Sequence, residues 1–212
     1  EIKANLKLKG SHIDNKKILI ESFSLDENNN KFKIDQLVLD KNFKILKFKQ
    51  IDLDYVDVEK RQNEISVIKE KNKYILNGPK FNANSLIEKF VNNDDNTNYE
   101  IFNQNINLNI NIDKVYLDKE HKINSLIGRL DYKKNEISSA ELNAFFSKDK
   151  KFKFTVKSTP QEKVTTLYLD EAKPIVKRYK FIKGFDEGIL DFYSSKKGNE
   201  SVSTLKIYDF KL

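Results

Sequence analysis

Apolar and polar residues alternate along much of this chain with a period of two. The clearest case is segment 105–112, NINLNINI, in which Ile106, Leu108, Ile110 and Ile112 are separated by asparagines. Successive side chains of a β-strand point to opposite faces, so such a segment has one apolar and one polar face. The pattern predicts a β-sheet with one apolar side.

The same alternation predicts strands along nearly the whole chain, joined by short polar turns such as 26–30, 133–135 and 196–199. The expected strands are 2–9, 17–25, 31–39, 43–58, 64–70, 73–76, 101–117, 123–132, 136–146, 151–157, 163–169, 188–194 and 201–212. Turns of this length favour antiparallel neighbours over βαβ crossovers. We therefore expect a mostly β fold, a long twisted antiparallel meander.

Two segments break the period of two and predict short amphipathic helices. In 84–91, Ser85 and Glu88 fit a capping box at the start of the helix. In 170–181, Asp170 or Lys173 starts the helix, Pro174 suits the first turn, and basic residues suit the C-terminal end of the helix dipole. We expect the apolar residues of both helices to pack on the concave or end region of the sheet. They are Leu86, Ile87, Phe90, Ile175, Val176 and Tyr179.

The helices divide the chain into halves of similar layout, each a run of strands with one short helix. A polar run, 92–98, separates them. We interpret residues 1–95 and 96–212 as two repeats of one β-meander, within one continuous sheet.

Two short helices are too little to cover the apolar side of so long a sheet. One outcome is a U-shaped, taco-like sheet with an apolar groove, since a large uncovered apolar surface marks a binding site. The other is a sheet that buries this side on itself, as a closed barrel or sandwich. The candidate groove residues, expected on one common side, are Ile106, Leu108, Ile110, Ile112, Phe152, Phe154 and Val156.

The net charge of +7 is spread along the chain, with 39 basic and 32 acidic residues interleaved. Nucleic-acid proteins more often cluster Lys and Arg on one face, so we expect no nucleic-acid partner. The absence of Met indicates that residue 1 is not a natural start, and the absence of Cys excludes thiolate sites. No run of about 18 apolar residues is present, so we expect any membrane anchor outside this sequence.

Catalytic patterns are missing, and we expect neither an enzyme nor a cofactor. The six glycines do not cluster into a phosphate loop, and the two histidines, His12 and His121, lack the spacing of metal ligands. Asp52 and Asp54 alternate with apolar residues, which is typical of the solvated face of a strand. Phe and Lys also alternate in 151–154, so they fall on opposite faces and form no stacking platform.

Several motifs in the second half occur in a fixed order. They are Asp170-Glu171-Ala172, then a short helix, Gly184, Gly188-Ile189-Leu190, and a final strand ending in Phe210-Lys211-Leu212. The first half contributes YILNGPKFNANSLIEKF, with Gly78, Phe81 and Leu86 at matching positions. This order resembles the C-terminal region of the AsmA-like family of Gram-negative envelope proteins, the YhdP and TamB type. Gly188 stands alone where members carry a glycine pair, and Lys173-Pro174 replaces small residues.

The resemblance implies a periplasmic protein, anchored to the inner membrane by a segment outside this sequence. Its apolar groove would carry phospholipid acyl chains between the inner and outer membranes, with other envelope proteins as further partners. The alternative is a structural or protein-interaction β module of the envelope without lipid cargo. A more distant alternative is a binder of single-stranded nucleic acid.

Overall fold

The computed structural model describes residues 3–14, 16–91, 105–133, 136–179 and 183–211. The strands are β1 (Ala4–Asp14), β2 (Lys17–Glu27), β3 (Asn30–Asp40), β4 (Ile45–Lys47), β5 (Gln50–Val56), β6 (Gln62–Glu70), β7 (Lys73–Asn82), β8 (Ile106–Tyr116), β9 (Lys122–Lys133), β10 (Glu136–Phe145), β11 (Lys151–Ser158), β12 (Lys163–Leu169), β13 (Asp186–Lys197) and β14 (Glu200–Lys211). The helices are α1 (Asn84–Val91) and α2 (Lys173–Tyr179). The expected mostly β fold is confirmed.

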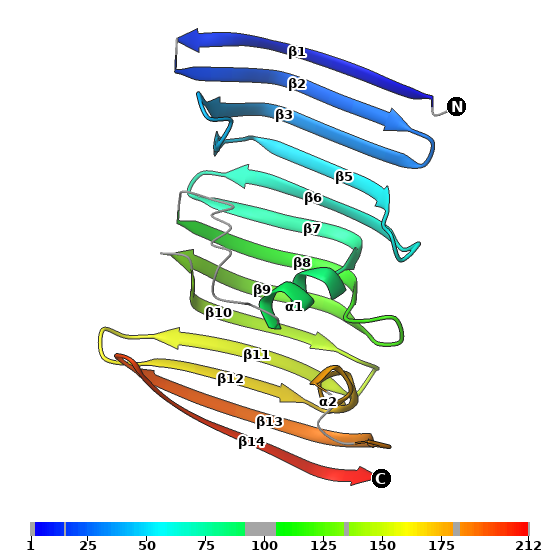
Figure 1. Cartoon of the computed structure of the whole chain (residues 1–212), viewed down its shortest axis with the longest axis vertical. Helices are drawn as coiled ribbons and strands as arrows, with labels where there is room; N and C mark the ends of the chain where they lie inside the picture. Colours follow the sequence, from blue (N-terminus) through cyan, green and yellow to red (C-terminus); the bar gives the residue numbers. More distant parts are fainter. Residues whose placement is uncertain (1–2, 15, 92–104, 134–135, 180–182, 212) are drawn as a thin grey trace.

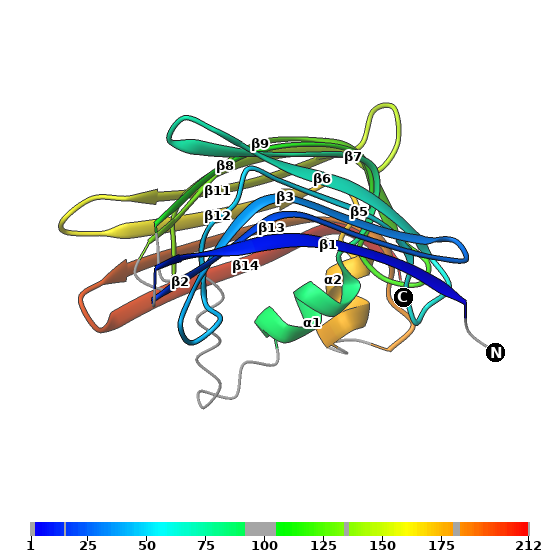
Figure 2. The ribbon, with the colours of Figure 1, turned by 90° about the horizontal axis from the view of Figure 1, so that it is seen from above.

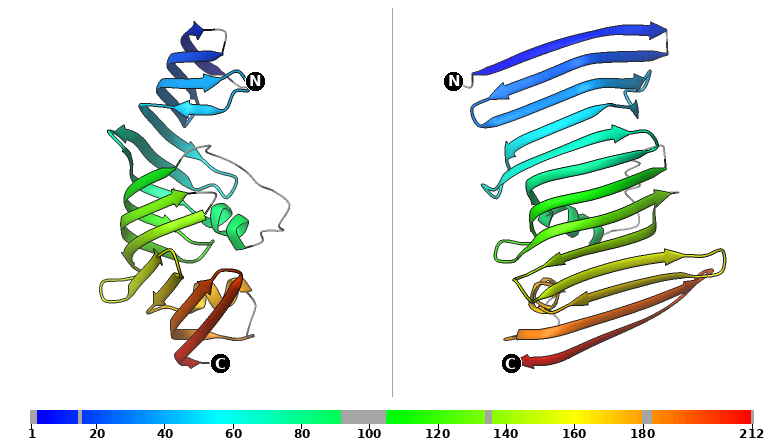
Figure 3. Two further views of the ribbon diagram at one scale, coloured as in Figure 1. Left: turned by 90° about the vertical axis from the view of Figure 1, so that its left-hand side faces the viewer. Right: turned by 180° about the vertical axis from the view of Figure 1, so that it is seen from behind.

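All these strands belong to one long, open sheet (Figure 1). Its order follows the sequence from β1 to β14, except that the short β4 pairs only with β3. The sheet is strongly twisted along its length (Figure 3, left). Its two edges, β1 and β14, each have a single neighbouring strand, so the sheet is not closed into a barrel.

One pair of strands contradicts the antiparallel prediction. β7 and β8 run parallel, with Leu76 opposite Ile110, so the sheet is mixed. A parallel pair needs a crossover connection, and α1 lies in it. The period of two is the same in parallel and antiparallel strands, and the alternation therefore could not show the direction of this pair. The expected repeat boundary near residue 95 lies outside the described residues.

The two helices lie on the same face of the sheet. Figure 2 shows the sheet arching over α1 and α2, which makes this face concave, and Figure 3 (right) shows the opposite face without helices. The predicted helix 84–91 is confirmed, and α2 begins at Lys173, one of its two predicted starts. The predicted end at residue 181 lies outside the described residues. Ser85 lies inside α1 and does not cap it. Instead, Asn82 Oδ1 accepts a hydrogen bond from the Asn84 N–H at 3.2 Å.

The predicted strand 43–58 is split into β4 and β5. The chain turns after β4, and Phe48 packs its ring against Tyr74 with 4.9 Å between ring centroids. Both residues are buried, together with Leu37, on the apolar face of β3 to β8. The alternating pattern does not show that the chain turns after β4. Phe48 fits an apolar position of the pattern whether the strand is continuous or split.

Candidate functional site

An unbroken row of apolar residues crosses the sheet from one edge to the other. Cross-strand neighbours lie on the same face, so a chain of paired residues traces one line across the strands. The row is Leu8, Phe23, Ile34, Ile51, Val67, Leu76, Ile110, Gly128, Leu142, Phe154, Leu167, Phe192 and Leu205. We call it the apolar row. It has one residue on every strand of the sheet except β4.

The neighbouring row, one residue along each strand, is almost entirely polar. It consists of Lys7, Ser24, Lys33, Asp52, Ser66, Asn77, Asn111, Ile127, Asn143, Lys153, Tyr168, Asp191 and Lys206. Adjacent positions on a strand point to opposite faces, so this row lies on the face opposite the apolar row. The register therefore divides the sheet into one apolar and one polar face.

The seven candidate groove residues lie on the face of the apolar row. Ile110 and Phe154 belong to the row, and Leu108 connects to Val156 through paired residues of β9 and β10. The remaining three, Ile106, Ile112 and Phe152, lie two residues from these along their strands. Ile112 and Val156 are buried, and the other five are half-buried.

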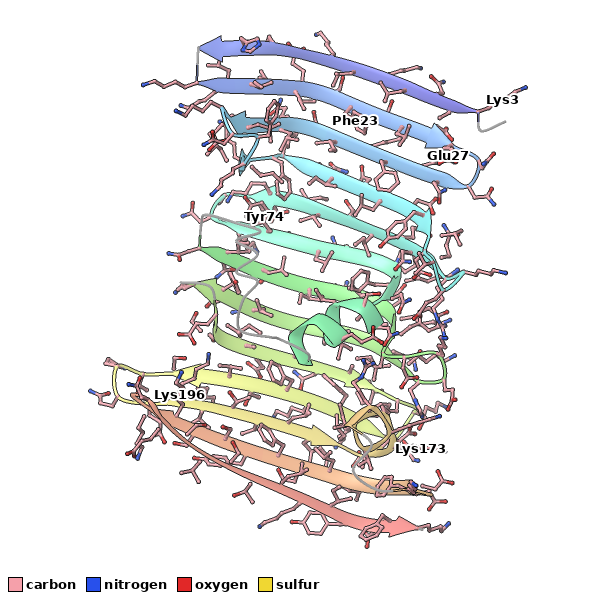
Figure 4. All side chains as sticks on the ribbon, in the orientation of Figure 1. Lys3, Phe23, Glu27, Tyr74, Lys173 and Lys196 are labelled. Atoms are coloured by element: carbon pink, nitrogen blue, oxygen red, sulfur yellow. The ribbon has the colours of Figure 1, made fainter. Side chains whose placement is uncertain are left out.

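The helices cover this face at one end of the strands. Val176 of α2 is fully buried, in a cluster with Ile112, Leu169 and Leu190 of the sheet. Ile87 and Ile175 pack partly buried against the same cluster. The shared cluster shows that the apolar row lies on the concave face. Figure 4 shows the side chains of this face in the view from the helix side.

The predicted helix residues differ in burial. The Leu86 side chain is 44% exposed, whereas Ile87 packs against the cluster. The side chains of Phe90 and Tyr179 lie outside the described residues. An isolated helical pattern places apolar residues on a common side, but it does not show how far the sheet extends beneath them.

Away from the helices, the concave face is only partly covered. Leu142 and Phe154 of the apolar row are half-buried, and Leu205 at the edge is 43% exposed. Leu167 and Phe192 are also half-buried, but they pack against the cluster that α2 covers. The helices pack at one end of the strands (Figure 1). In the part of the chain that the structure describes, these apolar side chains are therefore only partly covered.

A network of hydrogen-bonded polar side chains, which we call the polar clasp, connects the sheet to the helices at one end of the strands. Asn63 is fully buried. Its Oδ1 accepts a hydrogen bond from the Asn82 N–H at 2.7 Å, and its Nδ2 donates to Asp57 at 3.0 Å. Arg178 of α2 donates to Asn84 Oδ1 at 2.7 Å. The clasp joins the β5–β6 turn to the start of α1 and to α2. Sequence reasoning missed it, because asparagines are common in this chain and their pairing depends on the fold.

Asp57 is the centre of the polar clasp. Burial works to raise the pKa of its carboxyl, but hydrogen bonds to the carboxylate outweigh burial and hold the pKa below its ordinary value. The donors are the backbone N–H groups of Arg61 and Glu59 and the side chains of Asn82 and Asn63. A carboxylate saturated in this way is a structural acceptor and is unsuited to acid–base catalysis.

Other polar groups also have structural partners. His121 Nδ1 lies 2.8 Å from Asp118 Oδ2 in the β8–β9 turn, and Asp52 accepts hydrogen bonds from Gln50 and Ser66 on the polar face. A hollow of about 350 Å³ lies over this polar region, beside Asp52 and Ser66. In the part of the chain that the structure describes, no three potential metal ligands come together. No described helix is long and apolar enough to cross a bilayer.

Comparisons with known proteins identify no relative. No protein-family model, curated protein or solved structure matches this chain. The likeness to the AsmA-like family therefore rests on the sequence motifs alone.

Proposed function

We propose that this chain binds phospholipid acyl chains on its concave face, as a segment of a periplasmic AsmA-like protein that moves phospholipids between the inner and outer membranes. The observation that carries the proposal is the apolar row, which continues across the sheet without a polar residue. A path for acyl chains must stay apolar throughout, because a charge on it would have to be desolvated each time a chain passed.

The energetics suit an acyl ligand. Each methylene moved from water to an apolar surface contributes about 0.8 kcal/mol, so a few methylenes per strand add up to a substantial binding free energy. The half-buried residues of the apolar row provide this surface without any rearrangement of the sheet. A protein that filled its own core would need a second layer over them.

The proposal is tested with a photo-activatable phospholipid. Phe154→Asp and Ile110→Asp place a charge on the concave face, and they should abolish crosslinking in protein that remains folded by circular dichroism. Lys151→Glu and Lys153→Glu are matched controls in the same region. Their residues are exposed, and Lys153 belongs to the polar row, so both variants should crosslink like the wild type.

The second candidate, a protein-interaction module of the envelope, is favoured by the sheet edges. β1 and β14 each present an unpaired backbone edge, and Leu6 and Leu8 on β1 are exposed. Such edges can pair with a strand of another protein. If well-folded wild-type protein gives no phospholipid adduct, the interaction module becomes the better account and the lipid proposal is withdrawn.

A further inference from the structure

Basic residues gather at the end of the sheet that the helices leave free. Six turns meet there, at the left in Figure 1, where Figure 4 labels Lys196. We define the lysine rim as the described residues of these turns with two strand residues on either side: 13–14, 16–18, 39–46, 69–74, 132–133, 136–137, 157–164 and 196–201. Its described residues include twelve lysines and six carboxylates, a net charge of +6.

The opposite end of the sheet does not share this excess. The turns and connections there, with the two helices, are 26–31, 55–63, 81–91, 115–123, 144–152, 168–179 and 183–187. They contain thirteen basic and twelve acidic residues, a net charge of +1. The two ends of the strands therefore differ by five charges, although the basic residues looked evenly spread in the sequence. The fold sorts the charges, because alternate turns lie at opposite ends of a meander.

An exposed aromatic residue stands within the lysine rim. Phe43 is 70% exposed, between Lys41 and Lys44 in the turn from β3 to β4. This turn is well fixed, because Asp40 Oδ1 accepts hydrogen bonds from the N–H groups of Asn42 and Lys44 at 2.8 and 2.9 Å. The φ angle of Phe43 is 61°, a left-handed conformation that is unfavourable for a bulky residue. A strained, well-bonded turn that presents an aromatic ring to water suggests a partner for the ring.

We propose that the lysine rim docks on the surface of an anionic lipid bilayer, with Phe43 inserted among the headgroups. Lysines attract anionic lipids, and an aromatic ring beside them gains from the interface between headgroups and acyl chains. Docking in this way places the helix-free end of the concave face next to the bilayer. This inference gives the proposed lipid function a route of entry, and its biological role rests on that function.

A bilayer fits the lysine rim better than a nucleic acid does. A binder of single strands stacks successive bases on several exposed aromatic rings beside its basic residues. In the described part of the rim, Phe43 is the one strongly exposed aromatic side chain, and the second strongly exposed apolar side chain is aliphatic, Ile13 at 54%. A bilayer can take up an apolar side chain at any point of its surface. It therefore suits single apolar residues on separate turns.

The first test uses the absence of tryptophan from the chain. Phe43→Trp places the only tryptophan of the chain on the lysine rim, where it can be excited selectively. Its emission should shift to the blue on adding vesicles of phosphatidylcholine with phosphatidylglycerol, and brominated lipid should quench it. Val58→Trp is the matched control, since Val58 is 95% exposed in a turn at the opposite end. An unchanged emission of Trp at position 43, or equal shifts for both variants, would overturn the proposal.

The second test removes charge. Each lysine near an anionic surface contributes about fivefold to affinity, so the triple variant Lys41→Gln, Lys71→Gln and Lys196→Gln should bind these vesicles on the order of 100-fold more weakly. The control triple at the other end, Lys119→Gln, Lys122→Gln and Lys148→Gln, should bind nearly as the wild type. Binding should also weaken with salt and be lost on pure phosphatidylcholine.

The outcomes separate this inference from the proposed function. Phospholipid crosslinking without vesicle docking would refute the inference and leave the function standing. Vesicle docking without any phospholipid crosslinking to the concave face would refute the proposed function and leave the inference standing. Equal losses in both lysine triples would refute a directed surface. Tight binding of an oligonucleotide that depends on the same lysines, with no vesicle binding, would replace the bilayer by a nucleic acid.

Discussion

The uneven cover of the concave face has a measurable consequence for stability. Leu190 and Leu205 lie on this face in neighbouring strands, β13 and β14. Leu190 is fully buried beneath α2, whereas Leu205 is 43% exposed. The same change, Leu→Ala, at the two positions therefore compares covered and uncovered parts of one face. The change of intrinsic strand preference is similar at both sites, so it cancels in the comparison.

The expected magnitudes follow from burial. Leu190→Ala removes three buried carbon groups, about 2.4 kcal/mol of transfer free energy, and leaves a cavity that brings the total to about 3 to 4 kcal/mol. For Leu205→Ala we expect about 1 kcal/mol, because less of the side chain is buried and no enclosed cavity forms. The difference in the free energy of unfolding is thus about 2 to 3 kcal/mol.

Urea titration followed by circular dichroism measures both values, provided that the slope of unfolding free energy against urea stays the same. Equal losses of stability at the two positions would refute the reasoning. Two large losses of stability would mean that the concave face is covered throughout. Two small losses would mean that α2 does not pack on the sheet. Either result would remove the physical basis for an accessible apolar face.

Three further predictions concern the helices, a close approach of strands and pH. Val176→Asp should destabilise the fold by several kcal/mol through an unpaired buried charge, whereas Leu86→Asp should leave the melting temperature nearly unchanged. Gly128→Ala should cost about 2 to 4 kcal/mol in urea titrations, because the new Cβ would lie 1.9 Å from a carbonyl oxygen of β10. Gly198→Ala, in open space, should cost only about 1 kcal/mol. The pKa of Asp57 is lower in the folded than in the unfolded chain, so its contribution to stability is complete above about pH 5 and declines as the pH falls below about 4. Asp57→Asn should weaken that decline in thermal melts measured across this range, and an unchanged pH profile would contradict the role of Asp57 in the clasp.

The sequence predicted the strands and faces well because both follow from local alternation. In the stretch around Ile110, the period of two alone predicts that the apolar side chains lie on one face. Helix α1 was also predictable, since 84–91 carries a pattern that no strand can use. These features depend on residues that are close together in the chain.

The features that position the candidate site depend on residues far apart. The apolar row exists because the register aligns residues such as Phe23, Ile110 and Leu205 across strands, and no local pattern fixes that register. The parallel pairing of β7 with β8 and the inward turn of Phe48 were missed for the same reason. The charge of the lysine rim appears only when the turns are sorted by the end of the sheet at which they lie.

Site-specific crosslinking along one strand tests the central claim most directly. A photo-reactive amino acid is placed in turn at positions 152, 153, 154 and 155 of β11, and each protein is irradiated with phospholipid. The account predicts adducts at 152 and 154, which face the concave side, and almost none at 153 and 155. Adducts at all four positions, or at none of them in folded protein, would contradict it.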